Sequence, residues 1–279
     1  MKIAFQGEAG AYSEQAVFDY FGQVETQPCE SFDAVFDAVV SGVCDAALIP
    51  IENSLAGSIH QNYDLLLRHN LQIVGEYFLR VRHCLIALPD VKMEDIKKVI
   101  SHPQALGQCA GYLRNRHIKP EAVYDTAGSV KMLKESGARD TAAIASRRAA
   151  ELYGMKILEE GIEDNPENYT RFLATQCERK SDAPEGEAKT SIVFTLKNMP
   201  GALFKALSVF ALRDIDLTKI ESRPLAGKPW EYLFYIDFVG AERDEPIQRA
   251  LDHLSEYAVM LRVLGSYQRF AMGKLSNDI

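Results

Sequence analysis

Over about the first 176 residues, short runs of apolar residues alternate with segments whose apolar positions follow a helical period. The segment 32–40, for example, repeats Phe and Val at the spacing of one helix face. Alternating strands and helices are typical of α/β layers with largely parallel strands. The apolar runs that predict strands are 3–5, 46–51, 99–101, 123–125, 142–145 and 156–159.

One long strand-like stretch, 73–88, interrupts this alternation. An extended segment of that length suits a connection that carries the chain from one α/β lobe to another. We therefore expect two lobes that face each other across a cleft, as in a periplasmic-binding-protein-like fold.

The pattern changes after residues 177–190, a polar segment with Pro184 that predicts a linker. The elements beyond it follow the order βαββαβ, which is typical of the ferredoxin-like fold, with a hairpin through Gly227. We predict two domains, 1–180 and 190–270. In the second, strands are expected at 191–196, 216–225, 230–239 and 259–267, and helices at 201–214 and 246–257.

Composition and charge narrow the classes of protein that this chain fits. Of its 279 residues, 47% are hydrophobic and 25% charged, and the net charge is −8; such proportions are those of ordinary globular domains. The basic residues form no stripe of the kind that nucleic-acid-binding proteins carry. No apolar run approaches the roughly 18 residues of a membrane span. We expect neither a nucleic acid nor a membrane as a partner.

The five cysteines are widely spaced and form no C-x-x-C pair, so we expect neither a disulfide framework nor a zinc site. Reduced thiols suit a reducing compartment. The first seven residues, M-K-I-A-F-Q-G, predict a strand and a turn rather than the apolar core of a signal peptide. We therefore expect a cytoplasmic protein.

Small polar residues recur where predicted strands meet predicted helices. Ser13 follows the first strand, Asn53 and Ser54 follow a later one, and Ser101 ends another. In open α/β sheets the carboxyl ends of strands border the ligand crevice, and helix N-termini there favour anions. The set suits a small carboxylate, although each of these residue types also serves as an ordinary helix cap.

The segment 167–173, E-N-Y-T-R-F-L, places three different functional groups in a row. Arg171 is a permanent cation whose planar fork matches a carboxylate, and Phe172 offers a face to an apolar ring. Thr170 is a very weak acid, which assists the departure of a hydroxyl group only where the reaction itself is strongly downhill. The alternative is that these residues simply alternate in and out along a strand.

Motifs for the common cofactors are missing from the sequence. It contains no G-x-G-x-x-G or G-K-[ST] for a nucleotide, no H-E-x-x-H pair for zinc and no nucleophile elbow of the hydrolase type. We expect no cofactor and no metal.

Four motifs in the first 172 residues resemble, in the same order, motifs of prephenate dehydratases. The C-terminal part is similar to the ACT regulatory domain of these enzymes. In the C-terminal part the motifs are G-A-L-F at 201–204 and E-S-R-P at 221–224. Phe204 stands where the family usually has valine. No chorismate mutase segment precedes Met1, so we expect the dehydratase activity alone. The four earlier motifs are 7–16 (G-E-A-G-A-Y-S-E-Q-A), 50–59 (P-I-E-N-S-L-A-G-S-I), 101–109 (S-H-P-Q-A-L-G-Q-C) and 168–172 (N-Y-T-R-F).

The resemblance implies that prephenate loses water and carbon dioxide to give phenylpyruvate, a step of L-phenylalanine biosynthesis that needs no cofactor. It implies Thr170 as the acid, Arg171 as a clamp on a substrate carboxylate and Phe172 as a contact to the ring. The resemblance also implies a set of polar residues that face the substrate: Asn53, Ser54, Ser101, Gln108 and Ser13.

The resemblance also implies feedback control by L-phenylalanine, bound between ACT domains of neighbouring subunits in a homodimer or homotetramer. Two alternatives remain open. One is arogenate dehydratase, whose substrate carries an amino group in place of the keto oxygen. The other is a non-enzymatic binding protein for a small carboxylate, against which the missing export signal and the ACT-like part argue. The implied effector residues are Gly201, Ala202, Leu203, Glu221, Ser222, Arg223 and Pro224.

Overall fold

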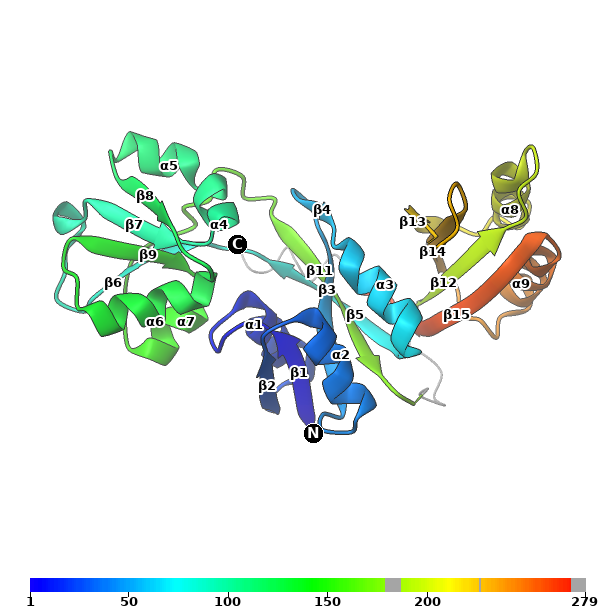
Figure 1. The fold of residues 1–279 in the computed structure, drawn as a ribbon, viewed down its shortest axis with the longest axis horizontal. Helices are drawn as coiled ribbons and strands as arrows, with labels where there is room; N and C mark the ends of the chain where they lie inside the picture. The colour runs from blue at the N-terminus through cyan, green and yellow to red at the C-terminus, as the bar shows by residue number, and fades with distance from the viewer. Residues whose placement is uncertain (179–186, 226, 272–279) are drawn as a thin grey trace. The chain divides into compact units, whose positions relative to one another are not determined.

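The computed structural model describes residues 1–178, 187–225 and 227–271 (Figure 1). The chain divides into two compact units, and the boundary between them falls within strands β5 and β11. Among the described residues, no helix is both long and apolar enough to cross a membrane. Unit 1 comprises Met1–His69 and Tyr77–Phe172, and unit 2 comprises Asn70–Glu76 and Leu173–Ile279.

The first lobe of unit 1 is built on a sheet with the strand order β2-β1-β3-β11-β5, and β4 pairs with β3. β1 runs parallel to both β2 and β3. Its Ile3, Ala4 and Phe5 are fully buried, because a parallel strand covered on both faces has a continuous apolar run. The elements are β1 (Lys2–Gln6), α1 (Tyr12–Phe21), β2 (Glu25–Cys29), α2 (Phe32–Val40), β3 (Ala46–Asn53), β4 (Gly57–Ser58), α3 (His60–His69), β5 (Gln72–Arg80) and β11 (Tyr169–Gln176).

The second lobe has a sheet with the order β10-β6-β9-β7-β8 and a core on each face. Neighbouring residues of β6 show why, since Leu85 packs into one core and Ile86 into the other. The first core includes Leu106 of α4, and the second includes Val130 of α6. The elements are β6 (Cys84–Ala87), the 3₁₀ turn η1 (Met93–Asp95), β7 (Lys98–Ser101), α4 (Pro103–Gln108), α5 (Ala110–Asn115), β8 (Lys119–Ala122), α6 (Thr126–Ser136), β9 (Thr141–Ala145), α7 (Arg147–Tyr153) and β10 (Lys156–Glu160).

The stretch 73–88 carries the chain from the first sheet to the second, as predicted, but it is two strands rather than one. β5 ends at Arg80 and β6 begins at Cys84, because the intervening residues leave one sheet before the next begins. The predicted strand at 123–125 is wrong. The strand there is β8, which ends at Ala122, and Asp125 instead caps α6 by accepting a hydrogen bond from the N–H of Gly128.

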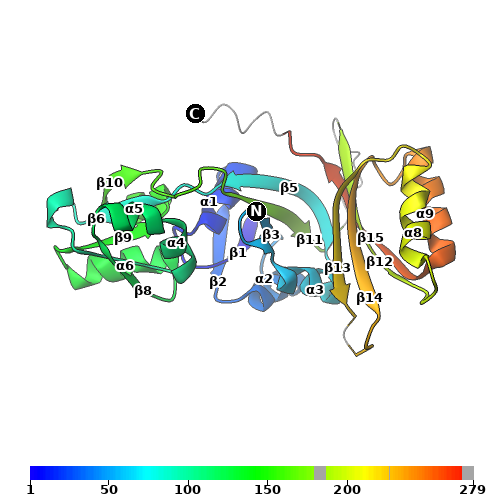
Figure 2. The same ribbon diagram turned by 90° about the horizontal axis from the view of Figure 1, so that it is seen from above.

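Unit 2 contains an antiparallel sheet in the order β13-β14-β12-β15, with α8 and α9 on one face (Figure 2). Phe194, Phe210, Phe238 and Leu254 are fully buried between the helices and the sheet. This order is that of a ferredoxin-like βαββαβ unit, so the two-lobed α/β region followed by a ferredoxin-like part is confirmed. The elements are β12 (Ala188–Leu196), α8 (Ala202–Ala211), β13 (Leu217–Pro224), β14 (Tyr232–Val239), α9 (Glu245–Tyr257) and β15 (Ala258–Gln268).

The predicted linker, 177–190, falls largely on residues 179–186, outside the described residues, and β12 already begins at Ala188. Within unit 2, the first part of β5 packs closely on β15. A Cβ on Gly265 would lie 2.0 Å from the carbonyl oxygen of Ile73. The close approach of the two backbones therefore requires glycine at this position.

Candidate active site

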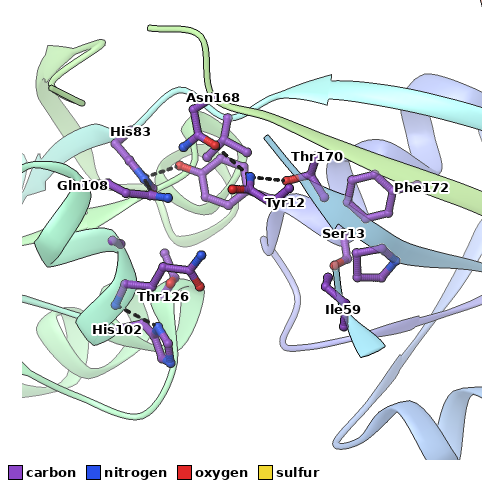
Figure 3. A pocket seen from close by; sticks show the side chains of 15 residues that line it. Tyr12, Ser13, Ile59, His83, His102, Gln108, Thr126, Asn168, Thr170 and Phe172 are labelled. Atoms are coloured by element: carbon purple, nitrogen blue, oxygen red, sulfur yellow. Dashed lines mark hydrogen bonds between the residues drawn. The ribbon is translucent and has the colours of Figure 1, made fainter. Parts of the chain in front are cut away.

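A cavity of about 190 Å³ lies in unit 1 and is lined by side chains from both of its lobes (Figure 3). The first lobe contributes the N-terminus of α1, the end of β3 and the start of β11, and the second contributes α4 and the start of α6. The lining residues are Tyr12, Ser13, Pro50, Asn53, Ile59, Val81, His83, His102, Gln104, Ala105, Gln108, Thr126, Asn168, Thr170 and Phe172.

Asn53 ends β3 and is held in one orientation by the turn that follows it. Its Oδ1 accepts hydrogen bonds from the backbone N–H groups of Leu55 (3.1 Å) and Ala56 (2.9 Å). Its Nδ2 is therefore the atom that faces residues 168–170, where it donates to Asn168 Oδ1 at 2.8 Å and to Thr170 Oγ1 at 3.0 Å. Because Thr170 accepts this hydrogen bond, its own hydroxyl proton remains available to an acceptor in the cavity.

The three residues T-R-F alternate along β11. Thr170 and Phe172 line the cavity, whereas Arg171 between them does not. Arg171 is only 6% exposed, and its guanidinium lies 5.9 Å from the centroid of the Phe78 ring. Since successive side chains of a strand point to opposite faces, the structure brings two of the three residues into the cavity. Arg171, predicted as a carboxylate clamp, is not brought into the cavity lining with them.

Of the polar residues predicted to face the substrate, Ser13, Asn53 and Gln108 line the cavity, and Ser54 and Ser101 do not. Ser101 is fully buried and donates to the carbonyl of Ile144 at 2.7 Å. Ser54 donates to the carbonyl of Glu167 at 2.8 Å and accepts from the N–H of Tyr169 at 2.9 Å. Each hydroxyl therefore joins two neighbouring segments of the chain by hydrogen bonds, and neither faces the cavity.

Sequence reasoning missed a chain of hydrogen bonds between Tyr12, His83 and Gln108. The Tyr12 hydroxyl lies 2.8 Å from His83 Nδ1, and His83 Nε2 lies 2.8 Å from Gln108 Oε1. Burial lowers the pKa of His83, although Gln108 and the nearby Glu163 act to raise it. Burial also raises the pKa of Tyr12. His83 is therefore neutral near pH 7. The sequence gave no signal that it links Tyr12 to Gln108, because its histidine is isolated there.

A helix N-terminus at the rim of the cavity favours a small anion over a cation. No Asp, Glu, Lys or Arg is among the described residues that line it. Helix α1 begins at its rim with Tyr12 and Ser13, and the preceding Ala11 supplies no side-chain cap. The free N–H groups and partial positive charge of such a helix N-terminus favour a carboxylate.

A second cavity, of about 320 Å³, lies in unit 2 at the start of α8. Gly201, Ala202 and Leu203 of the predicted effector site line it, together with Phe204 and Trp230. Gly201 precedes the helix with a φ of 74°, which a side chain would disfavour. The other predicted effector residues lie on β13 and do not line this cavity; they are Glu221, Ser222, Arg223 and Pro224.

A family model for prephenate dehydratase matches residues 3–180, and one for the ACT domain matches residues 190–255. The chain belongs to the prephenate dehydratase family. It is therefore a dehydratase, a carbon–oxygen lyase, with a C-terminal ACT domain in unit 2.

One relative and two solved structures show what this chain is similar to. "Arogenate dehydratase/prephenate dehydratase 2, chloroplastic" from Arabidopsis thaliana is 51% identical over 96% of this chain and 72% of its own length. A prephenate dehydratase in complex with L-Phe from Arthrobacter aurescens is 32% identical with a TM-score of 0.88, covering 96% of this chain and 90% of that one. A structure described as "GqqA- a novel type of quorum quenching acylases" is 36% identical with a TM-score of 0.92, covering 98% and 100%.

The expectation of a cytoplasmic location is wrong. Several relatives from Arabidopsis thaliana are named chloroplastic, which points to a plastid rather than the cytoplasm. The expectation rested on unpaired cysteines and on residues near Met1 that do not read as a secretory signal. Both features separate reducing from oxidising compartments, and neither distinguishes one reducing compartment from another.

Proposed function

We propose that this dehydratase converts prephenate to phenylpyruvate, with Thr170 as the group that assists the departing hydroxyl. The observation that carries the proposal is the hydrogen bond from Asn53 Nδ2 to Thr170 Oγ1 at 3.0 Å, at a cavity that both residues line. The bond fixes the hydroxyl and polarises its O–H toward a substrate oxygen.

The reaction breaks two bonds of the substrate ring. As the ring carboxylate leaves as carbon dioxide, its C–C bonding electrons move into the ring, and the C–O bond on the opposite carbon breaks with its electron pair on oxygen. The departing hydroxide takes up a proton and leaves as water. Because the ring becomes aromatic, the step is strongly downhill, and a weak donor such as Thr170 suffices at the leaving oxygen.

The neutral donors of the cavity support binding of the carboxylates. Ser13 lies at the N-terminus of α1, and Gln108 lies at the end of α4 where His83 orients its amide. The ring of Phe172, which lines the same cavity, offers an apolar face to the six-membered ring. Arg171 acts from the opposite face of β11, by packing the strand rather than by contacting the substrate.

Charge at the cavity favours prephenate over arogenate. The amino group of arogenate is a cation, and no acidic side chain is among the described lining residues. The ammonium group therefore finds no acidic partner among those residues, and the N-terminus of α1 disfavours a cation. Initial-rate kinetics of the purified chain with each substrate test this, with a higher kcat/KM for prephenate as the expected result. A higher value for arogenate contradicts the preference, and turnover of neither contradicts the proposed function.

We further propose that residues 1–180 form the catalytic domain and 190–270 the regulatory domain, with L-phenylalanine bound in the cavity of unit 2. In support, that cavity is lined by Gly201–Phe204 and the indole of Trp230, and the related Arthrobacter aurescens structure is described as a complex with L-Phe. We expect a homodimer or homotetramer joined through the ACT domains. Calorimetry with L-phenylalanine and analytical ultracentrifugation test both statements, and a non-binding monomer contradicts them.

A further inference from the structure

Glu14 lies in the first turn of α1 and is buried, although it carries a carboxylate; its side chain is 6% exposed. Its Oε2 accepts hydrogen bonds from the backbone N–H of Gly10 and from Arg148 Nε, both at 2.8 Å. Its Oε1 accepts from the hydroxyl of Thr26 at 3.0 Å. The bond from Gly10 joins the turn that precedes α1 to the first turn of the helix, and so holds the start of α1 in place.

Arg148 reaches Glu14 from the other lobe, because it lies on α7, which runs beside α1 (Figure 1). Its guanidinium also lies over the ring of Phe18, 4.1 Å from the ring centroid, at a distance that suits a cation–π contact. Glu14 and Phe18 are four residues apart on α1, so they share one face of the helix. Arg148 therefore fixes two successive turns of α1 against the second lobe.

The backbone before α1 is held by the same part of the second lobe. Ser146, which caps α7, donates from its hydroxyl to the carbonyl of Gly10 at 2.6 Å. Gly10 has a φ of 89°, and a Cβ there would lie 2.9 Å from the Cα of Ala149, so only glycine allows this approach. The position of the start of α1 is thus set by α7 as well as by its own lobe.

This position bears on the cavity, because Tyr12 and Ser13 at the N-terminus of α1 line it. Resting on the function proposed above, we propose that Arg148 is a positioning residue for substrate binding, which acts through Glu14 to hold the N-terminus of α1 at the cavity. Arg148 itself is not among the described residues that line the cavity.

Arg148 also offsets a charge that would oppose binding. The carboxylate of Glu14 lies beside the start of α1, where a negative charge disfavours a substrate anion. The guanidinium bonded to it cancels that charge. Without its cation, a buried carboxylate is unfavourable, and movement of Glu14 toward solvent would release the N–H of Gly10.

The variant Arg148→Met tests the assignment because it removes the cation and keeps an apolar side chain beside Phe18. We expect KM for prephenate to rise about 10-fold, the order of an interaction between a helix N-terminus and a carboxylate, and kcat to stay within about threefold. Prephenate keeps one carboxylate through the reaction, and binding of that group is equal in the ground state and the transition state. The matched control is Arg147→Met, which breaks an ion pair with Glu160 inside the second lobe and leaves KM unchanged.

The double variant Glu14→Gln with Arg148→Met separates this role from packing alone. It removes both charges and keeps an acceptor for the N–H of Gly10, so we expect KM to return to within about threefold of wild type. A KM that stays raised in the double variant shows that only packing was lost, and overturns the proposal. An Arg148→Met enzyme with an unchanged KM, or with a loss in kcat alone, overturns it as well.

Thermal unfolding shows whether Arg148→Met is folded. If it is not, Glu14→Ala is measured in its place, with the same expected rise in KM, because the N–H of Gly10 then loses its acceptor. A wild-type chain that is inactive on prephenate overturns the proposed function together with this inference. An active wild type with an unchanged KM in the variant overturns the role of Arg148 alone.

Discussion

The Nδ2 atom of Asn53 lies 3.0 Å from the Oγ1 atom of Thr170, and this hydrogen bond joins the ends of two strands that are 117 residues apart in the chain. The Oδ1 of Asn53 accepts from the backbone N–H groups of the turn that follows it, so its Nδ2 is left to donate to Thr170. Because Thr170 accepts that bond, its own hydroxyl proton is left to act as a donor. The Thr170 hydroxyl is thus oriented by its neighbours, which is the usual way in which a fold preorganises a side chain.

Removal of the Thr170 hydroxyl tests whether it assists the reaction. We expect Thr170→Ala to fold normally and to lose about 10²–10⁴ in kcat, whereas Thr170→Ser keeps the hydroxyl and most of the activity. Steady-state kinetics with prephenate and thermal unfolding of each variant provide the measurement. Near wild-type turnover by Thr170→Ala excludes this residue from the mechanism.

Replacement of Arg171 by methionine distinguishes packing from substrate binding. Because the guanidinium lies by Phe78 and not in the cavity lining, we expect Arg171→Met to lower the melting temperature while KM changes by less than about threefold. A direct clamp on a carboxylate would raise KM by about 10- to 100-fold. Arg139→Met, at an exposed ion pair with Asp90, is the matched control for loss of a guanidinium.

Burial of His83 makes stability depend on pH. The pKa of His83 in the folded state is lowered, and in the unfolded chain it is about 6.5. The unfolded state therefore binds more protons below that value, so the stabilising contribution is complete above about pH 6.5 and is lost as pH falls through the folded-state pKa. We expect the free energy of unfolding to fall more steeply between pH 7 and 5 for wild type than for His83→Gln. Equal slopes in urea titrations would show that His83 is not the group responsible.

The ion pair between Lys189 and Glu76 within unit 2 is buried, with side chains 7% and 0% exposed and the atoms Nζ and Oε1 2.8 Å apart. We expect Lys189→Met to reduce the free energy of unfolding by about 3–5 kcal/mol, because Glu76 is left buried without its cation. The double variant with Glu76→Leu should recover most of that loss. A single variant as stable as wild type would be inconsistent with an intact buried pair.

The backbone contact at Gly265 predicts intolerance of any side chain. A methyl group there meets the Ile73 carbonyl at 2.0 Å, and that neighbour is backbone rather than a flexible side chain. We expect Gly265→Ala to lower the free energy of unfolding by about 3 kcal/mol or more, whereas Gly107→Ala, with open space around its Cβ, changes it much less. Chemical denaturation of both variants makes the comparison.

Local pattern in the sequence determined the main elements of this protein and their order. Helical spacing in 32–40 gave α2, with Phe32–Val40 as its bounds. The βαββαβ order of the C-terminal part predicted the observed sheet. These features follow from side-chain period and chain order, which are local properties. The family was indicated by a resemblance of several motifs, among them the one around Thr170, and the family models support it.

Only the tertiary structure decided which polar groups face the cavity. Ser101 and Gln108 lie in one sequence motif, yet Ser101 bonds the Ile144 carbonyl and Gln108 lines the site. Arg171 turns away because β11 alternates, and Asn53 presents its Nδ2 to Thr170 because the turn that follows it occupies its Oδ1. The reason is physical: a polar side chain satisfies whichever partner packing brings near, and that partner is set by contacts distant in sequence.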